Sequence, residues 1–151
     1  MLEKVLLPVD GSETSRKAVD FAVRLLEGSG CKVTLLAVVE EPAYAAFWSD
    51  GMIAPEVVLP PPEELRLELE KRAEAMLVDI SSLLKGAGLK VEHRVRFGNA
   101  ASEILREAEE GGYDLVIMGS HGRGVLGGFL LGSVSNRVVH HARCPVLIVR
   151  G

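Results

Sequence analysis

The glycines between residues 116 and 133 have a spacing that suits a phosphate site. The stretch VIMGSHGRGVLGGFLLGS holds six of the 16 glycines in this 151-residue chain. Gly119 lets a ligand approach the end of an apolar run closely, and Gly122 and Gly124 can adopt the positive φ that turns successive N–H groups toward an anion. Nine residues separate Gly122 from Gly132-Ser133, the expected start of a helix. This long spacing predicts a phosphate site between a strand end and a helix start.

The expected helix supplies further phosphate donors. Ser133 can serve as its N-cap, and the first backbone N–H groups of a helix have no partner within it. These groups and the helix dipole favour phosphate, and the hydroxyls of Ser133 and Ser135 add donors. The apolar residues 125–131 are expected to fold back against protein, which would bring the two sets of donors together.

Asp10 is the candidate for binding a sugar. It follows the apolar run at residues 4–9 and precedes Gly11-Ser12. A carboxylate beside phosphates is unfavourable unless it faces groups that donate hydrogen bonds to it, and the hydroxyls of a ribose would do so. The alternative is that Asp10 is a turn residue that caps the first helix.

Two common nucleotide motifs are excluded. Residues 122–127, GRGVLG, match G-x-G-x-x-G after a strand, but a dinucleotide fold needs an acid about 20 residues later to hold the ribose. All 21 acidic residues lie at or before Asp114, and the helix is expected to start only at Ser133. A Walker A loop is excluded because Gly-Lys-Ser/Thr does not occur in the sequence.

The composition predicts one globular domain over residues 1–151. The chain is 48% hydrophobic and 25% charged, which suits a packed core. Its net charge of -4 argues against a general nucleic-acid binder. No window approaches the roughly 18 apolar residues of a membrane span, and the N-terminal apolar run is too short for a signal peptide. We expect a cytoplasmic protein without nucleic-acid or membrane partners, with Cys31 and Cys144 as buried free thiols.

Apolar strands that alternate with amphipathic helices would position the candidate residues. Strands are expected at residues 4–9, 32–39, 90–97, 114–119 and 145–149, the third of them half-exposed. Helices are expected after Ser12, over 63–85, after Asn99 and from Ser133. This order predicts an α/β fold with a single doubly wound five-stranded parallel sheet, strand order 3-2-1-4-5 and helices on both faces. Its ligand site would lie at the carboxyl ends of strands 1 and 4, where the strand order reverses.

The segment at about residues 40–62 is irregular and ends in three prolines. It contains Tyr44, Phe47 and Trp48, three of the seven aromatic residues. A loop this long inside a compact domain is usually functional or disordered. Two interpretations stay open: a lid or partner-binding segment, and a loop that merely packs on the core.

Several blocks of the sequence resemble the universal stress protein family, in its ATP-binding branch. They are the spacing G119-x2-G122-x9-G132-S133, the opening VLLPVDGSETS, and the segments LLAVVE, DLVIMGSHGRG and GSVSNRVVHHARCPVLIV. The resemblance covers nearly the whole chain, with residues 42–62 as its least informative part. It implies a Rossmann-like, adenine nucleotide alpha hydrolase-like fold that binds ATP, ADP or AMP, with or without Mg²⁺.

The resemblance also implies which residues contact the nucleotide. Those at the adenine and ribose are Pro8, Asp10 and the backbone of Val38, and those beneath the nucleoside are Met118 and Gly119. Those along the phosphates are His121, Gly122 and Arg123, and those at the β- and γ-phosphates are Gly132, Ser133, Val134 and Ser135. For His121 and Arg123, an ordinary loop position without ligand contact is the alternative.

The resemblance suggests a stress-response regulator or sensor that changes its protein partner when ATP binds. The alternative is an enzyme on the same nucleotide, a slow ATPase or a self-phosphorylating protein, but His121 is the only candidate general base near the phosphate segment. A receiver-like module is disfavoured because RFGNAAS, at the end of the third strand, lacks the acid that would be phosphorylated.

The last strand predicts a homodimer. Pro145–Val149 carries no charge, and at the edge of the sheet it would present unpaired backbone groups. Pairing with a second copy would cover this edge, and members of the similar family form homodimers in this way. The identity of any other protein partner does not follow from the sequence.

Overall fold

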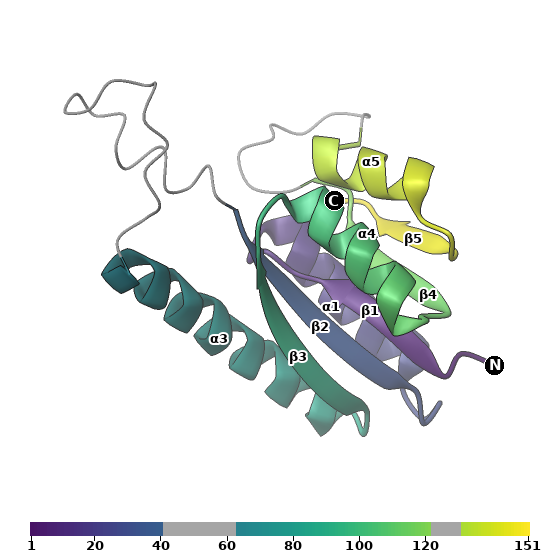
Figure 1. Cartoon of the computed structure of the whole chain (residues 1–151). Coiled ribbons are helices and arrows are strands. Elements are labelled where there is room, and N and C mark those ends of the chain that lie inside the picture. Colours follow the sequence, from purple (N-terminus) through teal and green to yellow (C-terminus); the bar gives the residue numbers. More distant parts are fainter. Residues whose placement is uncertain (41–62, 122–130) are drawn as a thin grey trace.

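Five parallel strands form one sheet in the order β3-β2-β1-β4-β5, which confirms the predicted topology. The computed structural model describes residues 1–40, 63–121 and 131–151 (Figure 1). The strands are β1 (Lys4–Pro8), β2 (Lys32–Val39), β3 (Lys90–Phe97), β4 (Leu115–Gly119) and β5 (Val146–Val149). The segment at residues 41–62, with its three aromatic residues, lies outside the described residues.

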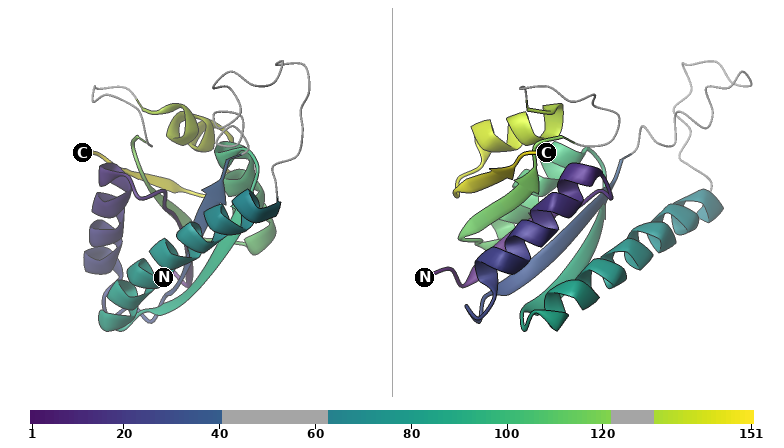
Figure 2. Two further views of the ribbon diagram at one scale, coloured as in Figure 1. Left: turned by 90° about the vertical axis from the view of Figure 1, so that its left-hand side faces the viewer. Right: turned by 180° about the vertical axis from the view of Figure 1, so that it is seen from behind.

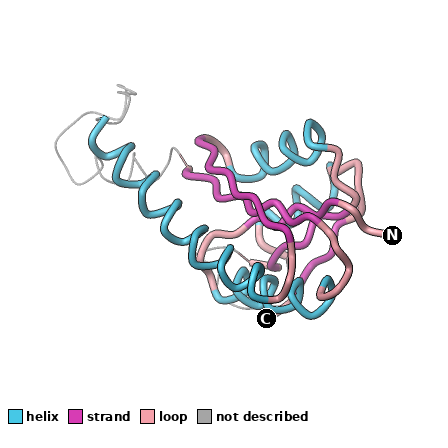
Figure 3. Tube along the Cα trace, turned by 90° about the horizontal axis from the view of Figure 1, so that it is seen from below, coloured by secondary structure: helices cyan, strands magenta, loops and turns pink. Residues whose placement is uncertain are grey.

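Helices cover both faces of the sheet, as predicted. On one face lie α1 (Glu13–Leu26) and α3 (Glu63–Gly86), and on the other lie α4 (Ala100–Gly111) and α5 (Ser133–His141). The view from behind shows α1 and α3 together, and the view from below shows the strands between two layers of helices (Figures 2 and 3). None of the described helices is both long enough and apolar enough to cross a membrane.

The central strand β1 is buried because it contributes to the core on both faces. Val5, Leu6 and Leu7 have no exposed surface. Val5 and Leu7 belong to the cluster under α1 and α3, whereas Leu6 belongs to the cluster under α4 and α5. This explains why the sequence of β1 is an unbroken apolar run instead of an alternating one.

Two of the helix starts follow local sequence signals. Ser12 is the N-cap of α1 and accepts a hydrogen bond from the backbone N–H of Ser15. Asn99 caps α4 in the same way, accepting from the N–H of Ser102. These short polar side chains satisfy N–H groups that the helix leaves free.

The start of α5 differs from the prediction. Gly132 is the N-cap, and Ser133 is the first helical residue, without a side-chain capping bond. The reason is tertiary: the N–H of Gly132 donates to the carbonyl of Ser120, 2.7 Å away, and fixes the chain before Ser133 is reached. The predicted capping role of Ser133 is therefore wrong.

Strands β1 and β4 part at their carboxyl ends. Their register holds only the pairs Val5↔Leu115 and Leu6↔Val116. Beyond these pairs β1 stays with β2, where the N–H of Val9 donates to the carbonyl of Leu36, and β4 stays with β5. The gap between them opens where the strand order reverses, as the sequence predicted.

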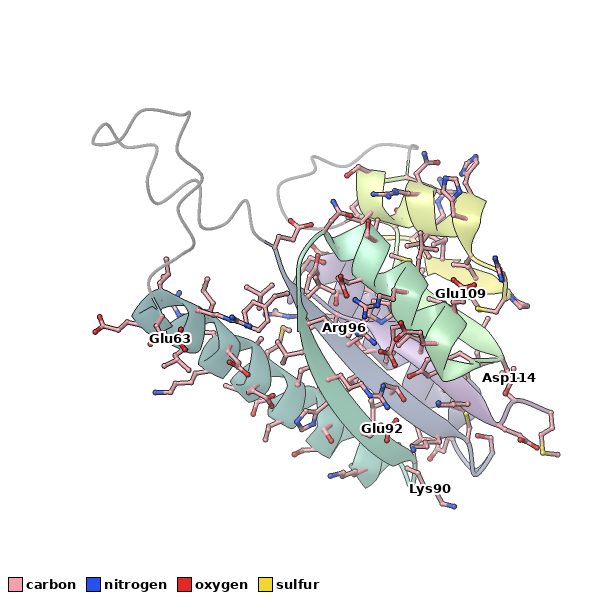
Figure 4. The ribbon with its side chains drawn as sticks, in the orientation of Figure 1. Glu63, Lys90, Glu92, Arg96, Glu109 and Asp114 are labelled. Atoms are coloured by element: carbon pink, nitrogen blue, oxygen red, sulfur yellow. The ribbon has the colours of Figure 1, made fainter. Side chains whose placement is uncertain are left out.

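A layer of ion pairs joins α4 to the outer strand β3. Glu107 of α4 is fully buried and accepts hydrogen bonds from Arg94, Arg96 and Tyr113. In Figure 4 the labelled side chains of Glu92 and Arg96 lie on the face of the sheet that α4 covers. Since a buried charge is costly unless it is paired, these partners are what allows Glu107 to be ionised in the core.

The two cysteines are free, as predicted, but they differ in burial. Cys31 is buried, whereas Cys144 is only half-buried, which corrects the expectation for that residue. Burial raises the pKa of both thiols. Both are therefore less reactive than an ordinary exposed cysteine.

We predict that Glu107→Gln lowers the free energy of unfolding by about 1–3 kcal/mol, because Arg94 and Arg96 lose the charge of their buried partner and keep only their more exposed carboxylate partners. Urea denaturation measures the change. The matched control is Glu109→Gln on the same helix, since Glu109 forms an exposed ion pair with Arg143. We expect the control to lose less than about 1 kcal/mol, and equal losses in both variants would contradict the assignment.

The same substitution should alter the acid sensitivity of the fold. Burial by itself would raise the pKa of Glu107, but hydrogen bonds from Tyr113 and Arg96 outweigh it and hold this pKa below its ordinary value. The stabilisation is present above the unfolded pKa of about 4.3 and is lost as the pH falls through the lower, folded pKa. Unfolding measured across that acid range should therefore depend less steeply on pH in Glu107→Gln than in the wild type.

Candidate functional site

A cavity of about 580 Å³ lies at the carboxyl ends of β1, β2 and β4. Its volume falls in the range of small-molecule sites. Nine of the predicted site residues line it: Pro8, Asp10, Val38, Met118, Gly119, His121, Ser133, Val134 and Ser135. The fold thus brings together residues that are up to 127 positions apart in the chain (Pro8 to Ser135). Because α5 starts beside the gap between β1 and β4, a ligand in the cavity could contact the end of β1, the end of β4 and the start of α5 together.

Asp10 serves the turn after β1 and still faces the cavity. Its Oδ1 accepts a hydrogen bond of 2.9 Å from the N–H of Ser12, and its own N–H lies 3.2 Å from Oγ of Ser15. Among the described residues, Oδ2 has no hydrogen-bond partner. The two interpretations of Asp10 are therefore compatible, because one oxygen shapes the turn and the other has no partner among the described residues.

Gly119 is required by packing as well as by its place in the cavity wall. A Cβ at this position would lie 2.6 Å from Oγ1 of Thr14 and 2.7–2.8 Å from the backbone C and O of the same residue. The absence of a side chain therefore lets the first turn of α1 approach the end of β4. The prediction gave ligand approach as the reason for this glycine, and the structure adds a reason that holds without any ligand.

The backbone of His121 is fastened to the start of α1. Its carbonyl accepts hydrogen bonds from Oγ1 of Thr14 and, at 3.4 Å, from Oγ of Ser12. The N–H of His121 also lies 3.4 Å from Oγ1 of Thr14. The ring has its own partner, because Nδ1 lies 2.9 Å from Oγ of Ser120. Both the backbone and the side chain of His121 are thus held where β4 meets the cavity.

The first turn of α5 offers free donors, though fewer than the sequence suggested. The first backbone bond of this helix runs from the N–H of Asn136 to Gly132, so the N–H groups of Ser133, Val134 and Ser135 have no partner within the helix. The hydroxyl of Ser135 donates instead to the carbonyls of Ser120 and Gly132, at 2.7 and 3.1 Å. Of the two predicted hydroxyl donors, Ser133 is exposed and has no side-chain hydrogen-bond partner among the described residues, whereas Ser135 is already engaged.

Gly132 itself does not line the cavity, and its N–H is bound to Ser120. It supports the site by setting where α5 begins. Gly122 and Arg123, together with Gly124, lie outside the described residues, so their predicted contacts with phosphate stay predictions.

One wall of the cavity was missed by the analysis of the sequence. It is formed by residues of α3, which are Leu69, Arg72, Ala73 and Met76. Leu69 and Met76 are apolar residues of the predicted amphipathic helix, and Met76 packs against the core as well as lining the cavity. Helical periodicity cannot separate core positions from cavity positions on one stripe, so the sequence carried no signal for this wall.

Three acidic or cationic groups besides His121 face the cavity: Asp10, Glu40 and Arg72. Oε1 of Glu40 lies 3.3 Å from the N–H of Ala100 at the start of α4, and Nε of Arg72 lies 3.3 Å from Glu68. Over the described parts of the chain, no three His, Cys, Asp or Glu side chains gather in a way that could hold a metal ion. The described wall therefore offers hydrogen-bonding groups and apolar contacts.

Comparisons with known proteins agree on one family. A sequence model described as the universal stress protein family matches residues 1–150. Universal stress protein YxiE of Bacillus subtilis is 34% identical over 151 residues, which cover 99% of this chain and 100% of that protein. The structure of MJ0577, a universal stress protein of Methanocaldococcus jannaschii, matches with a TM-score of 0.84 at 31% identity, covering 100% of this chain and 97% of that one. A universal stress protein solved in complex with cAMP matches with a TM-score of 0.66 at 25% identity, covering 99% and 97%.

We predict that Gly119→Ala destabilises the fold by about 1–3 kcal/mol, because the new methyl group overlaps the backbone of Thr14 and forces α1 away from β4. Thermal or urea unfolding without ligand measures this. Gly86→Ala is the matched control, since a Cβ at Gly86 meets nothing within 4 Å. The control should be neutral or slightly stabilising. An unchanged stability in Gly119→Ala would show that this glycine serves ligand approach alone.

Proposed function

Because this chain belongs to the universal stress protein family, we propose that it binds an adenine nucleotide, with ATP as the main ligand, in the cavity at the ends of β1, β2 and β4. The observation that carries the proposal is the meeting of Asp10 with the free N–H groups of α5 in one cavity. Asp10 would accept hydrogen bonds from the ribose hydroxyls, and the start of α5 would bind the phosphates; what supports this is that both line the same cavity.

The lining suggests how the nucleotide lies. The apolar end of the cavity, with Val38 of β2 and Leu69 and Met76 of α3, suits the purine ring. Asp10 would then face the ribose, and the phosphates would reach Ser133 and Val134. This orientation of the nucleotide suits the distribution of charge in the chain. The phosphates would lie against the part of the chain after Asp114, which contains no acidic residue.

The proposal favours a regulator over an enzyme. Of the two acids in the described wall, Asp10 would be used by the turn and the ribose, and Glu40 accepts a hydrogen bond from the N–H of Ala100 at the start of α4. His121 is the remaining candidate for a general base. If Mg²⁺ accompanies the nucleotide, phosphate oxygens and water would supply its ligands. Binding would then act by changing which partner protein is recognised, in the cytoplasm, where ATP is available.

The family adds support at the level of ligand class. The relative solved with cAMP holds an adenine nucleotide on the same fold. A shared fold does not by itself establish a shared ligand. The proposal therefore rests on the arrangement of Asp10 and α5 in this chain, and the relative makes an adenine nucleotide the first ligand to test.

We also propose that two copies of this chain pair along β5. The ladder to β4 uses the carbonyls of Pro145 and Val149, which accept from Val116 and Ser120. Since alternate residues of a strand bond to the same neighbour, the backbone groups of Val146 and Ile148 point to the open edge. β5 is the last strand in the sheet order, and it carries no charge to discourage pairing.

We predict that the freshly purified protein carries ATP, ADP or AMP in native mass spectrometry, and that it binds added ATP in calorimetry. The wild type should prefer ATP over 2′,3′-dideoxy-ATP by about tenfold, the value of a hydrogen bond to a charged group. Asp10→Asn should lose this preference, because the amide keeps the oxygen needed by Ser12 but loses the charge that attracts the ribose hydroxyls.

Two results would contradict this proposal. One is the absence of binding by the wild type at millimolar ATP with Mg²⁺. The other is an unchanged preference for ATP in Asp10→Asn. Phosphate release by the wild type that clearly exceeds release by Ser133→Ala would instead favour the slow ATPase.

For the dimer, we predict that Ile148→Pro gives a monomer in sedimentation equilibrium while the wild type sediments as a dimer. Proline removes an N–H that faces the open edge and leaves the ladder to β4 in place. Ile148→Ala is the control, since it loses the same side-chain packing but keeps the N–H, and it should remain dimeric. A dimeric Ile148→Pro variant would exclude pairing through β5.

A further inference from the structure

Ser120 is a buried junction between three parts of the site. Only 2% of its surface is exposed. Its N–H donates to the carbonyl of Val149 at the end of β5, 3.0 Å away, and its carbonyl accepts from Gly132 and from Ser135, both at 2.7 Å. Its hydroxyl lies 2.9 Å from Nδ1 of His121. The backbone of Ser120 therefore fixes β5 and α5, and its side chain is left to act on the ring of His121.

Oγ of Ser120 and Nδ1 of His121 can each donate or accept, so the direction is inferred from the acceptors that the buried hydroxyl can reach. A serine hydroxyl has one proton to donate, and a neutral imidazole has one nitrogen that donates and one that accepts. Among the described residues, Nδ1 of His121 is the acceptor found for this hydroxyl. When Oγ donates to Nδ1, that nitrogen must be unprotonated, and the ring proton must reside on Nε2.

The contacts of His121 leave the other ring nitrogen, Nε2, for the cavity. His121 lines the cavity, and its backbone N–H and carbonyl are both in contact with Thr14. With the backbone held by α1 and Nδ1 held by Ser120, Nε2 is the ring nitrogen left for the cavity. A donor held in this way loses little conformational entropy when an anion arrives.

We infer that Ser120 is a positioning residue that holds neutral His121 in its Nε2–H tautomer, so that Nε2 donates a hydrogen bond to a phosphate group of the ligand. The inference rests on the proposed nucleotide function. It goes beyond that function by assigning a role to a residue that does not line the cavity, and by fixing His121 as a hydrogen-bond donor. The arrangement matches the general pattern in which the second ring nitrogen of a functional histidine is held by a neighbour.

A purely structural role for Ser120 is the competing explanation. Ser135 shows what such a role looks like, because its hydroxyl donates to two backbone carbonyls. The hydroxyl of Ser120 instead meets the side chain of a cavity residue. The two explanations differ in what happens to the His121 ring when the hydroxyl is removed.

The first test reads the tautomer directly, without any nucleotide. Long-range ¹H–¹⁵N NMR of the histidine rings is recorded at about pH 8, where an ordinary imidazole is neutral, and His121 is assigned by comparison with His121→Ala. His140 serves as an internal reference of the opposite type, since its Nδ1 lies 2.8 Å from the carbonyl of Asn136 and must donate to it. We expect the Nε2–H form for His121, and a mixture of tautomers in Ser120→Ala.

The second test measures binding by calorimetry for ATP and for adenosine. Ser120→Ala should weaken the binding of ATP about three- to tenfold, which is the contribution of one hydrogen bond. The affinity for adenosine should stay unchanged. The double variant with His121→Ala should bind ATP no more weakly than His121→Ala alone. Ser81→Ala is the matched control, because Ser81 is a buried serine of α3 that does not line the cavity, and it should change neither ligand.

Three results would overturn the inference: an Nδ1–H tautomer of His121 in the wild type, equal weakening of ATP and adenosine by Ser120→Ala, or additive losses in the double variant. If Ser120→Ala fails to fold, the wild-type spectrum still decides the tautomer. If the wild type binds no adenine nucleotide, the proposed function fails, and the spectra of the wild type and Ser120→Ala separately decide whether Ser120 holds the ring.

Discussion

The parting of β1 and β4 is the constraint on which the rest of the site depends. The pairing of β1 with β4 ends at Leu6↔Val116, and beyond it β1 stays with β2 while β4 stays with β5. The gap between the two strand ends is closed by the segments that follow the strands. The first turn of α1 enters from one side, against Gly119, and the first turn of α5 closes the other. The cavity is the space that these two helix starts leave open.

The remaining walls are firm because the elements that carry them are fixed elsewhere. α4 contributes Ala100 and Ile104 to the cavity. Its start is held by Glu40 and its body by the buried charge of Glu107. Ion pairs form only when the two charged groups lie at particular positions, whereas apolar contacts can form at many relative positions of two elements. The ion pairs of Glu107 therefore define where α4 lies on the sheet. The cavity-facing side chains of α4 therefore do not depend on a ligand for their position.

The sequence was sufficient for the fold because the signals for strands, helices and their order are local. The apolar run of β1, the serine at the start of α1 and the asparagine at the start of α4 each act within a few residues, and the order of elements then limits the topology. Asp10 and Ser133 could be assigned to one site for the same reason, since strand ends meet at one edge. The failures were tertiary. The start of α5 is set by the carbonyl of Ser120, which is distant in sequence. The need for Gly119 arises from the backbone of Thr14. The cavity wall on α3 is formed by apolar residues of a helix that also packs on the core.

The two edges of the sheet are unlike each other, and this difference would limit the growth of the proposed assembly. β5 is short and apolar, whereas β3 is twice as long and carries Lys90, Glu92, Arg94 and Arg96 along one face. Charged side chains on an edge strand oppose the addition of another strand. Two chains joined at β5 by a two-fold axis would use the same surface twice and leave a β3 strand at each end. The sheet would then be capped at both ends by its own charged strands, so that growth stops at two copies and does not proceed to a fibre.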